Sequence, residues 1–260
     1  MNAVPRSRKG HMLGGLLVLC MAVGPAAAAV AADIRVAVAA NFAAPMQKIA
    51  TLYSRRTGNP VLLSLGGTGK FYAQIHNGAP FDILLAADSA TPRKLEQEGL
   101  AVPGSRFTYA VGKLVLWSAR PGLVDDQGRV LRDTGWQHLA IADPKLAPYG
   151  AAAMQALDRL GLTARVLPRL VTGEDIGQTW QFVASGNADL GFVAMSQVLA
   201  HGRPASGSMW VVPDSLYAPI RQDAVLLNPG RDRPEVAGLL KFLHDDASVR
   251  ALVRSYGYGS

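Results

Sequence analysis

Short apolar runs rich in β-branched residues alternate with longer stretches of helical periodicity over most of this sequence. A repetition of strand, helix and strand favours parallel sheets with helices on both faces. The sequence therefore predicts an α/β fold. The expected strands are residues 34–39, 61–64, 83–86, 114–117, 139–142, 190–193, 210–212 and 224–227. The expected helices are residues 43–56, 70–77, 91–98, 150–160, 175–185 and 235–245.

The N-terminal end of the sequence differs in character from the rest. Three basic residues precede an apolar core at residues 12–23, and small residues fill positions 26–32. This order is typical of a secretory signal peptide, whereas a membrane anchor needs about 20 consecutive apolar residues. We therefore expect residues 1–32 to be a signal peptide that is cleaved after Ala31 or Ala32, and the mature protein to be exported.

Composition excludes several classes of function. The single cysteine, Cys20, lies inside the expected signal peptide, so no disulfide can stabilise the mature chain. The mature chain is only mildly basic and has no basic run, so we expect no nucleic-acid partner. Its histidines lack metal-ligand spacing, and no Gly-x-Ser-x-Gly nucleophile motif occurs. These observations argue against zinc chemistry and against an esterase-type nucleophile.

A glycine-rich turn at residues 66–70, Gly-Gly-Thr-Gly-Lys, separates an expected strand from an expected helix. The first N–H groups of a helix have no internal partner and lie at the positive end of its dipole, so such a turn favours an anion. A nucleotide-binding phosphate loop would need glycine where Ser64 stands and Ser or Thr where Phe71 stands. The turn therefore indicates capture of an anion without hydrolysis, or else a tight turn without a ligand.

Three other corners lead from a strand into an expected helix and carry candidate donors. Asn41 can cap its helix or donate its amide outward to an anion. Tyr149 follows Pro148, which suits a first helical turn, and its ring can pack in the core or its hydroxyl can donate. Asp175 suits a helix cap that directs the Ile176 N–H into a cleft. Ligands of α/β sheets collect at the carboxyl ends of strands, so these corners and the glycine turn predict one site.

Several segments that follow one another along the mature region carry a family resemblance. Each motif alone is weak, but their combination in this order is specific. On these motifs the chain resembles the periplasmic molybdate-binding proteins, the receptor subunits of ABC importers. The motifs are residues 36–42 (Val-Ala-Val-Ala-Ala-Asn-Phe), 67–75 (Gly-Thr-Gly-Lys-Phe-Tyr-Ala-Gln-Ile), 78–82 (Gly-Ala-Pro-Phe-Asp), 142–144 with 148–150, 173–176 (Gly-Glu-Asp-Ile) and 191–193 (Gly-Phe-Val).

The resemblance implies a two-lobed periplasmic binding protein fold of type II. Each lobe would be a mainly parallel sheet flanked by helices, with the ligand in the cleft between the lobes. The first lobe would contain residues 33–112 and 220–260, and the second would contain residues 113–219. Carried over by position, the ligand contacts would be Asn41, Thr68, Tyr149 and Ile176, with Ala40 and Gly67 as further candidates.

The same resemblance implies a monomeric periplasmic receptor, not an enzyme, that binds molybdate or tungstate and delivers it to a membrane permease. Molybdenum would enter only as the oxyanion, and no cofactor is implied. In one branch of the family, serine stands at the positions of Asn41 and Thr68. That branch has alanine at Tyr149 and a ligand-contacting tyrosine at Ala194, so we expect Tyr149 to supply the hydroxyl here.

Alternatives stay open at this level. A receptor for another small anion, such as sulfate or phosphate, would need a similar donor shell. An exported hydrolase that uses Asp143 or Glu174 is a remote alternative, because acids at turns and helix starts are common for dipole reasons alone. The sequence also leaves open whether Lys70 or Ala194 contributes to the site.

Overall fold

The structure is a computed structural model in which residues 1–3, 33–200, 203–204 and 206–259 are described. The chain divides into two units, Met1–Val30 and Ala31–Ser260, and both sheets lie in the second unit. Apart from its first three positions, the expected signal peptide lies outside the described residues. Among the described helices, none has the length and apolar character that crossing a membrane requires.

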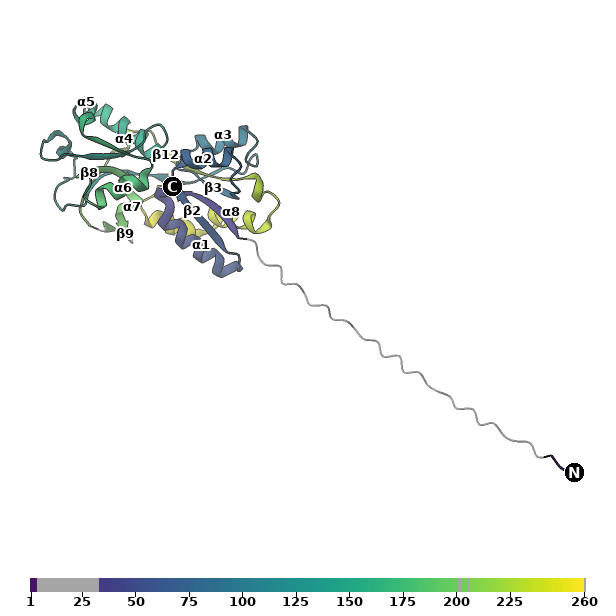
Figure 1. Ribbon diagram of the computed structural model, residues 1–260. Helices are drawn as coiled ribbons and strands as arrows, with labels where there is room; N and C mark the ends of the chain where they lie inside the picture. Colours follow the sequence, from purple (N-terminus) through teal and green to yellow (C-terminus); the bar gives the residue numbers. More distant parts are fainter. Residues whose placement is uncertain (4–32, 201–202, 205, 260) are drawn as a thin grey trace. The chain divides into compact units, whose positions relative to one another are not determined.

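The first of two five-stranded sheets is assembled from distant parts of the chain (Figure 1). Its strand order is β2-β1-β3-β12-β4. β1 pairs parallel with β2 and β3, and β12 pairs antiparallel with β3 and β4, so β12 runs against the other four strands. The strands are β1 (Ile34–Ala39), β2 (Val61–Gly66), β3 (Ile83–Leu85), β4 (Phe107–Gly112) and β12 (Ile220–Leu226).

The second sheet is built from the middle of the chain and has the order β11-β5-β8-β6-β7. β6 pairs parallel with β7 and β8, while β5 pairs antiparallel with β8 and β11, so β5 runs against the other four. A separate antiparallel pair joins β9 (Leu199–Ala200) to β10 (Arg203–Pro204). The strands of the second sheet are β5 (Leu114–Ser118), β6 (Leu139–Ala142), β7 (Leu170–Gly173), β8 (Leu190–Ala194) and β11 (Ser208–Val211).

The chain passes between the two sheets twice. Lys113 alone separates the end of β4 from the start of β5, and residues 212–219 lead from β11 to β12. On its return the chain inserts β12 between β3 and β4. The first sheet therefore contains strands from both sides of the second sheet in sequence, and β12 enters it directly from the second crossing.

Helices pack on the sheets through apolar stripes. α1 buries Met46, Ile49 and Tyr53, whose spacing places them on one helix face. These side chains share a core cluster with Leu239 and Leu243 of α8. The α-helices are α1 (Ala43–Thr57), α2 (Thr68–His76), α3 (Ala90–Gln97), α4 (Pro148–Arg159), α5 (Thr163–Val166), α6 (Ile176–Ala184), α7 (Met195–Val198), α8 (Pro234–Asp245) and α9 (Ala247–Ser255). The 3-10 helices are η1 (Ala40–Phe42), η2 (Arg129–Arg132), η3 (Leu167–Arg169), η4 (Asp214–Leu216) and η5 (Asn228–Gly230).

The α/β class expected from the sequence is confirmed, and each sheet is mainly parallel with one opposed strand. Periodicity did not predict seven of the described strands and α-helices: β4, β7, β9, β10, α5, α7 and α9. The last strand of the first sheet also begins earlier than the expected residues 224–227. Gln222 and Asp223 interrupt the apolar pattern there, yet both are fully buried in β12, where side-chain partners satisfy them.

Candidate functional site

Four helix starts that the sequence singles out follow strands of the two sheets. η1 and α2 follow β1 and β2, and α4 and α6 follow β6 and β7. A Cβ atom placed on Gly67 would lie 3.1 Å from the Asp175 Cβ, and one placed on Gly177 would lie 3.1 Å from the Ala40 Cβ. The start of α6 therefore touches the start of η1 and the turn before α2.

The glycine turn before α2 also contacts the loop that leads into α4. The Gly69 N–H donates to the Leu146 carbonyl at 3.3 Å, and a Cβ on Gly69 would lie 3.0 Å from that oxygen. A side chain at this position would press against the Leu146 carbonyl, so glycine suits the close approach of the two loops. The structure thus brings all four corners into one cluster.

The residues expected to contact a ligand are all buried. The exposed fraction is 2% for Asn41 and Thr68, 1% for Tyr149 and 4% for Ile176. The further candidates, Ala40 and Gly67, are partly buried. A polar group left unpaired in such surroundings is costly, and a paired one forms a stronger hydrogen bond than in water. The direction of each proton therefore decides what the cluster can bind.

Two buried hydroxyls already accept one hydrogen bond and keep a proton to donate. Thr68 Oγ1 accepts from the Ala87 N–H at 2.9 Å, and the Tyr149 hydroxyl accepts from Gln222 Nε2 at 3.0 Å. A hydroxyl has one proton and two lone pairs, so each can still donate to another acceptor. Burial raises the pKa of Tyr149 well above its usual value, so its phenol stays neutral and remains a donor.

Asn41 uses its amide hydrogens inside the protein. Its Nδ2 donates to Gln222 Oε1 at 2.8 Å and to the Tyr258 hydroxyl at 2.9 Å. Its main-chain carbonyl accepts from the hydroxyls of Ser196 and Tyr258, each at 2.8 Å. Among the described residues, Asn41 Oδ1 is buried without a hydrogen-bond partner. The amide is therefore neither a helix cap nor an outward donor, the two roles that the sequence suggested for it.

Ile176 is the first residue of α6, and its N–H lies outside the helix cap. The Asp175 carboxylate caps the helix by accepting from the N–H groups of Gly177 and Gln178, at 2.8 and 2.9 Å. The first N–H group of a helix has no internal partner, so the Ile176 N–H remains at the positive end of the dipole. Gln197 Nε2 donates to the Ile176 carbonyl at 2.9 Å and holds this turn in place.

Lys70, Ala194 and the acids of the hydrolase alternative are engaged with the protein itself. Lys70 Nζ pairs with Glu174 Oε1 at 3.3 Å, and both side chains are more than half exposed. Ala194 is buried and donates its N–H to Gln197 Oε1 at 3.0 Å. Asp143 Oδ1 accepts from the Lys145 N–H within the turn before α4. Glu174 thus takes part in an ion pair, and Asp143 stabilises a turn.

Two cavities border the cluster. One of about 500 Å³ is lined by Ala40 and Asn41 from the first sheet and by Asp175 and Gly177 from the second, among other residues. The other, of about 440 Å³, is lined by Gly69, Leu146 and Pro148, among other residues. Both volumes fall within the range of small-molecule pockets. Of the residues expected to contact a ligand, Ala40 and Asn41 line the first cavity, whereas Gly67, Thr68, Tyr149 and Ile176 line neither.

Sequence reasoning missed four polar residues of this cluster: Gln222, Tyr109, Tyr258 and Ser196. Gln222 carries a signal that could have found it, because it interrupts an apolar strand and a buried amide needs partners. The other three come from β4, the C-terminal end and α7, and no local pattern links those segments.

Comparison with known proteins places this geometry in context. The model of the family described as bacterial extracellular solute-binding protein matches residues 34–259. The chain is 57% identical to the molybdate-binding protein ModA of Azotobacter vinelandii over 234 residues, covering 90% of this chain and 92% of that protein. It is 49% identical to the molybdate-binding protein ModA of Rhodobacter capsulatus over 244 residues, covering 94% and 95%. The solved structure of the Azotobacter vinelandii periplasmic molybdate-binding protein matches with a TM-score of 0.85 at 41% identity, covering 87% and 99%, which confirms the two-lobed fold.

Proposed function

Because this chain belongs to the family of bacterial extracellular solute-binding proteins, we propose that it captures molybdate and delivers it to the membrane permease of an ABC importer. The observation that carries the proposal is the identity to molybdate-binding proteins over some nine-tenths of the chain. The buried cluster of neutral donors agrees with it, since an oxyanion needs hydrogen-bond donors that are not already paired with anions of the protein.

The ligand shell that we propose combines groups from both sheets. Thr68 and Tyr149 each donate a hydroxyl proton, and Ile176 donates its N–H. Asn41 donates its main-chain N–H at the start of η1, because its amide hydrogens are used inside the protein. Within the described residues, α2 and α4 begin without a side-chain cap, which leaves the main-chain N–H groups of Thr68 and Tyr149 as further candidates, because the Gly69 N–H already donates to the Leu146 carbonyl and Pro148 has no N–H. Further contacts come from the main chain at Ala40 and Gly67.

Neutral donors suffice for useful affinity. A hydrogen bond to a charged group contributes about 1.5–3 kcal/mol, and a helix end adds about 0.3–2 kcal/mol. After the costs of lobe closure and ligand immobilisation, such a sum leaves about −8 kcal/mol, which corresponds to roughly micromolar affinity. Selectivity is then geometric, because tungstate is nearly the same size as molybdate and sulfate is smaller. We therefore include tungstate as a ligand.

The proposal extends to the organisation of the protein. Residues 33–112 and 220–260 form one lobe, residues 113–219 form the other, and closure of the lobes completes the shell. The protein acts as a periplasmic monomer after loss of residues 1–32. It performs no catalysis, takes up molybdenum only as the oxyanion and uses no cofactor or nucleic acid.

Titration calorimetry on refolded, ligand-free protein tests the proposal. Sodium molybdate should bind at one site per chain, sodium tungstate should bind about equally, and sulfate and phosphate should bind weakly or not at all. No heat with molybdate would contradict the proposal. Tighter binding of sulfate or phosphate would favour a receptor for another anion, and turnover of phosphate or carboxylate esters would favour a hydrolase.

A further inference from the structure

We propose that Gln222 is a positioning residue that directs the Tyr149 hydroxyl proton toward the bound oxyanion, an inference that rests on the proposed function. Gln222 lies in β12 and is fully buried. Its Oε1 accepts from Asn41 Nδ2 at 2.8 Å, and the Tyr109 hydroxyl, whose one proton goes to Oε1 or to the Ala86 carbonyl, lies 3.1 Å from Oε1. Its Nε2 donates to the Tyr149 hydroxyl at 3.0 Å. One side-chain amide thus joins the proposed ligand contacts of the two sheets.

A main-chain carbonyl fixes the direction of this hydrogen-bond chain. The Asn41 carbonyl can only accept, and the one proton of the Tyr258 hydroxyl goes to that carbonyl at 2.8 Å or to Ser196 Oγ at 3.0 Å. Having spent its one proton, the Tyr258 oxygen must accept from Asn41 Nδ2. The other hydrogen of that amide then points at Gln222 Oε1, and Gln222 turns its Nε2 toward the Tyr149 oxygen. The Tyr149 hydroxyl therefore keeps its own proton, which none of these hydrogen-bonded groups accepts.

The backbone around Gln222 is shaped to hold it there. Gln222 is paired with Ala110 and Asp223 with Thr108, so Tyr109 is an extra residue of β4 at a bulge. Bulges beside functional sites re-aim side chains, and here the Tyr109 hydroxyl reaches Gln222 Oε1 and the Ala86 carbonyl.

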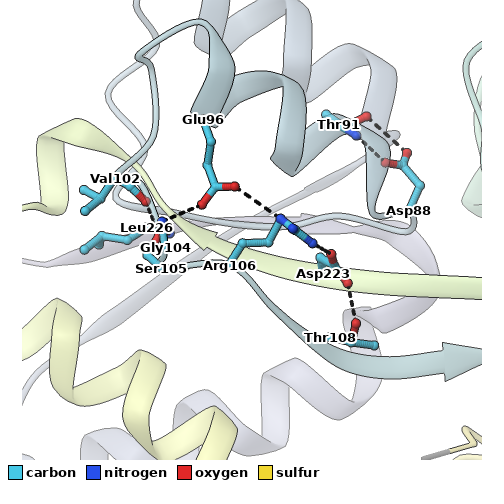
Figure 2. Close-up of polar contacts among 10 residues, drawn as sticks. All are labelled: Asp88, Thr91, Glu96, Val102, Gly104, Ser105, Arg106, Thr108, Asp223 and Leu226. Atoms are coloured by element: carbon cyan, nitrogen blue, oxygen red, sulfur yellow. Dashed lines mark hydrogen bonds and ion pairs between the residues drawn. The ribbon is translucent and has the colours of Figure 1, made fainter.

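The residue after Gln222 anchors this part of β12 (Figure 2). The fully buried Asp223 carboxylate accepts from Arg106 Nη1 at 2.6 Å and from Thr108 Oγ1 at 2.7 Å. Arg106 Nε in turn donates to Glu96 Oε2 at 3.2 Å. Arg106 directly precedes β4 and Thr108 lies within it, so these bonds tie the two strands together on the side of the bulge that precedes Tyr109. The main chain that carries Gln222 is therefore held beside β4.

The variant Gln222→Glu tests the proposal with almost no change of shape. Its carboxylate still accepts from Asn41 and Tyr109, but it cannot donate to Tyr149, so the phenol proton turns toward the carboxylate and away from the ligand. Molybdate affinity at about pH 8.5 should fall by about 100-fold or more, because a donor is lost and a negative charge is added. Burial raises the pKa of a carboxyl group, so lowering the pH to about 6 should protonate it, restore a donor and recover much of the affinity.

Gln222→Met is the control for the loss of hydrogen bonding alone, and wild type measured at each pH is the reference. The Met variant should bind about 10-fold more weakly than wild type, with no recovery at low pH. Equal affinity of Gln222→Glu and wild type, or a loss that is the same at every pH, would overturn the inference. If the wild-type protein does not bind molybdate, the result contradicts the proposed function and not this inference.

A double-mutant cycle gives a second readout that does not require the Glu variant to fold. If Gln222 acts through Tyr149, then Tyr149→Phe should cost less affinity in the Gln222→Met background than in wild type, by about three-fold or more. Additive losses would mean that the two residues act independently and would overturn the inference. Circular dichroism and thermal unfolding of each variant separate weak binding from misfolding.

Discussion

Gln222 and Asp223 are neighbours in β12, yet their side chains enter polar regions of opposite character. Gln222 lies among phenols and amides, which are uncharged. Asp223 lies among charges that are paired with one another, as Figure 2 shows. We call the first region the neutral cluster (Asn41, Thr68, Tyr149, Gln222 and Tyr258) and the second the ionic cluster (Glu96, Arg106, Thr108 and Asp223).

The difference shows how one strand serves two tasks. In the ionic cluster the carboxylates of Glu96 and Asp223 both pair with the guanidinium of Arg106, and these bonds hold the fold. In the neutral cluster, burial raises the pKa of Tyr149 and Tyr258, so their phenols stay protonated, and two hydroxyls keep protons to donate. A fixed carboxylate there would take those protons and repel an anion. The comparison predicts that changes in the ionic cluster alter stability and changes in the neutral cluster alter affinity.

The largest effect is expected from Arg106→Met in the ionic cluster. Of the side-chain partners that the structure describes, only Thr108 then remains for the buried Asp223 carboxylate, which should lower the free energy of unfolding by about 3 kcal/mol. The control is Arg56→Met, which breaks the more exposed pair with Asp246 and should cost at most about 1 kcal/mol. Denaturant unfolding at neutral pH measures both, and equal losses would contradict the assignment of Arg106.

Tyr149→Phe should produce the next largest effect, on binding. It removes a donor to the oxyanion, so molybdate affinity should fall by about 10-fold to 100-fold, which corresponds to about 1.5–3 kcal/mol. Tyr53→Phe is the matched control, because its hydroxyl donates to the Glu235 carbonyl at 2.7 Å between α1 and α8. That control should lose about 1 kcal/mol of stability and keep its affinity. Calorimetry that finds wild-type affinity for Tyr149→Phe would remove Tyr149 from the site.

Thr68→Val should have a smaller effect of the same kind. The shape is kept while the hydroxyl is lost, both as donor and as acceptor for the Ala87 N–H. We expect affinity to fall by about 5-fold to 10-fold, with a stability loss of about 1 kcal/mol. Thr68→Ser keeps the hydroxyl and should bind within about two-fold of wild type. Similar affinities for the two variants would show that the hydroxyl does not contact the ligand.

The smallest effect is expected from Lys70→Met, which lies outside both clusters. Its exposed pair with Glu174 should contribute at most about 0.5 kcal/mol to stability, and molybdate affinity should change by less than about two-fold. A larger loss of affinity that weakens with added salt would instead give Lys70 a direct role in attracting the anion.

Local patterns predicted most elements because strands and helices differ in hydrophobic period. α9 was not predicted, although it has a clear N-cap. The Asp246 carboxylate accepts from the N–H groups of Ser248 and Val249 at 2.8 and 3.2 Å. This cap directly follows the end of α8, so the sequence pattern of α8 runs into that of α9 without a visible break. β4 was not predicted either, because its bulge at Tyr109 interrupts the alternation of a regular strand.

The sequence by itself determined the α/β class, the four helix starts with their donors and the family resemblance, because these depend on residues close together in the chain. Only the tertiary structure decided where the protons go. The amide of Asn41 turns inward because Gln222 and Tyr258, 181 and 217 residues away, meet it. A hydrogen bond's direction depends on every partner of the groups involved, and those partners come together only when both ends of the chain join one sheet.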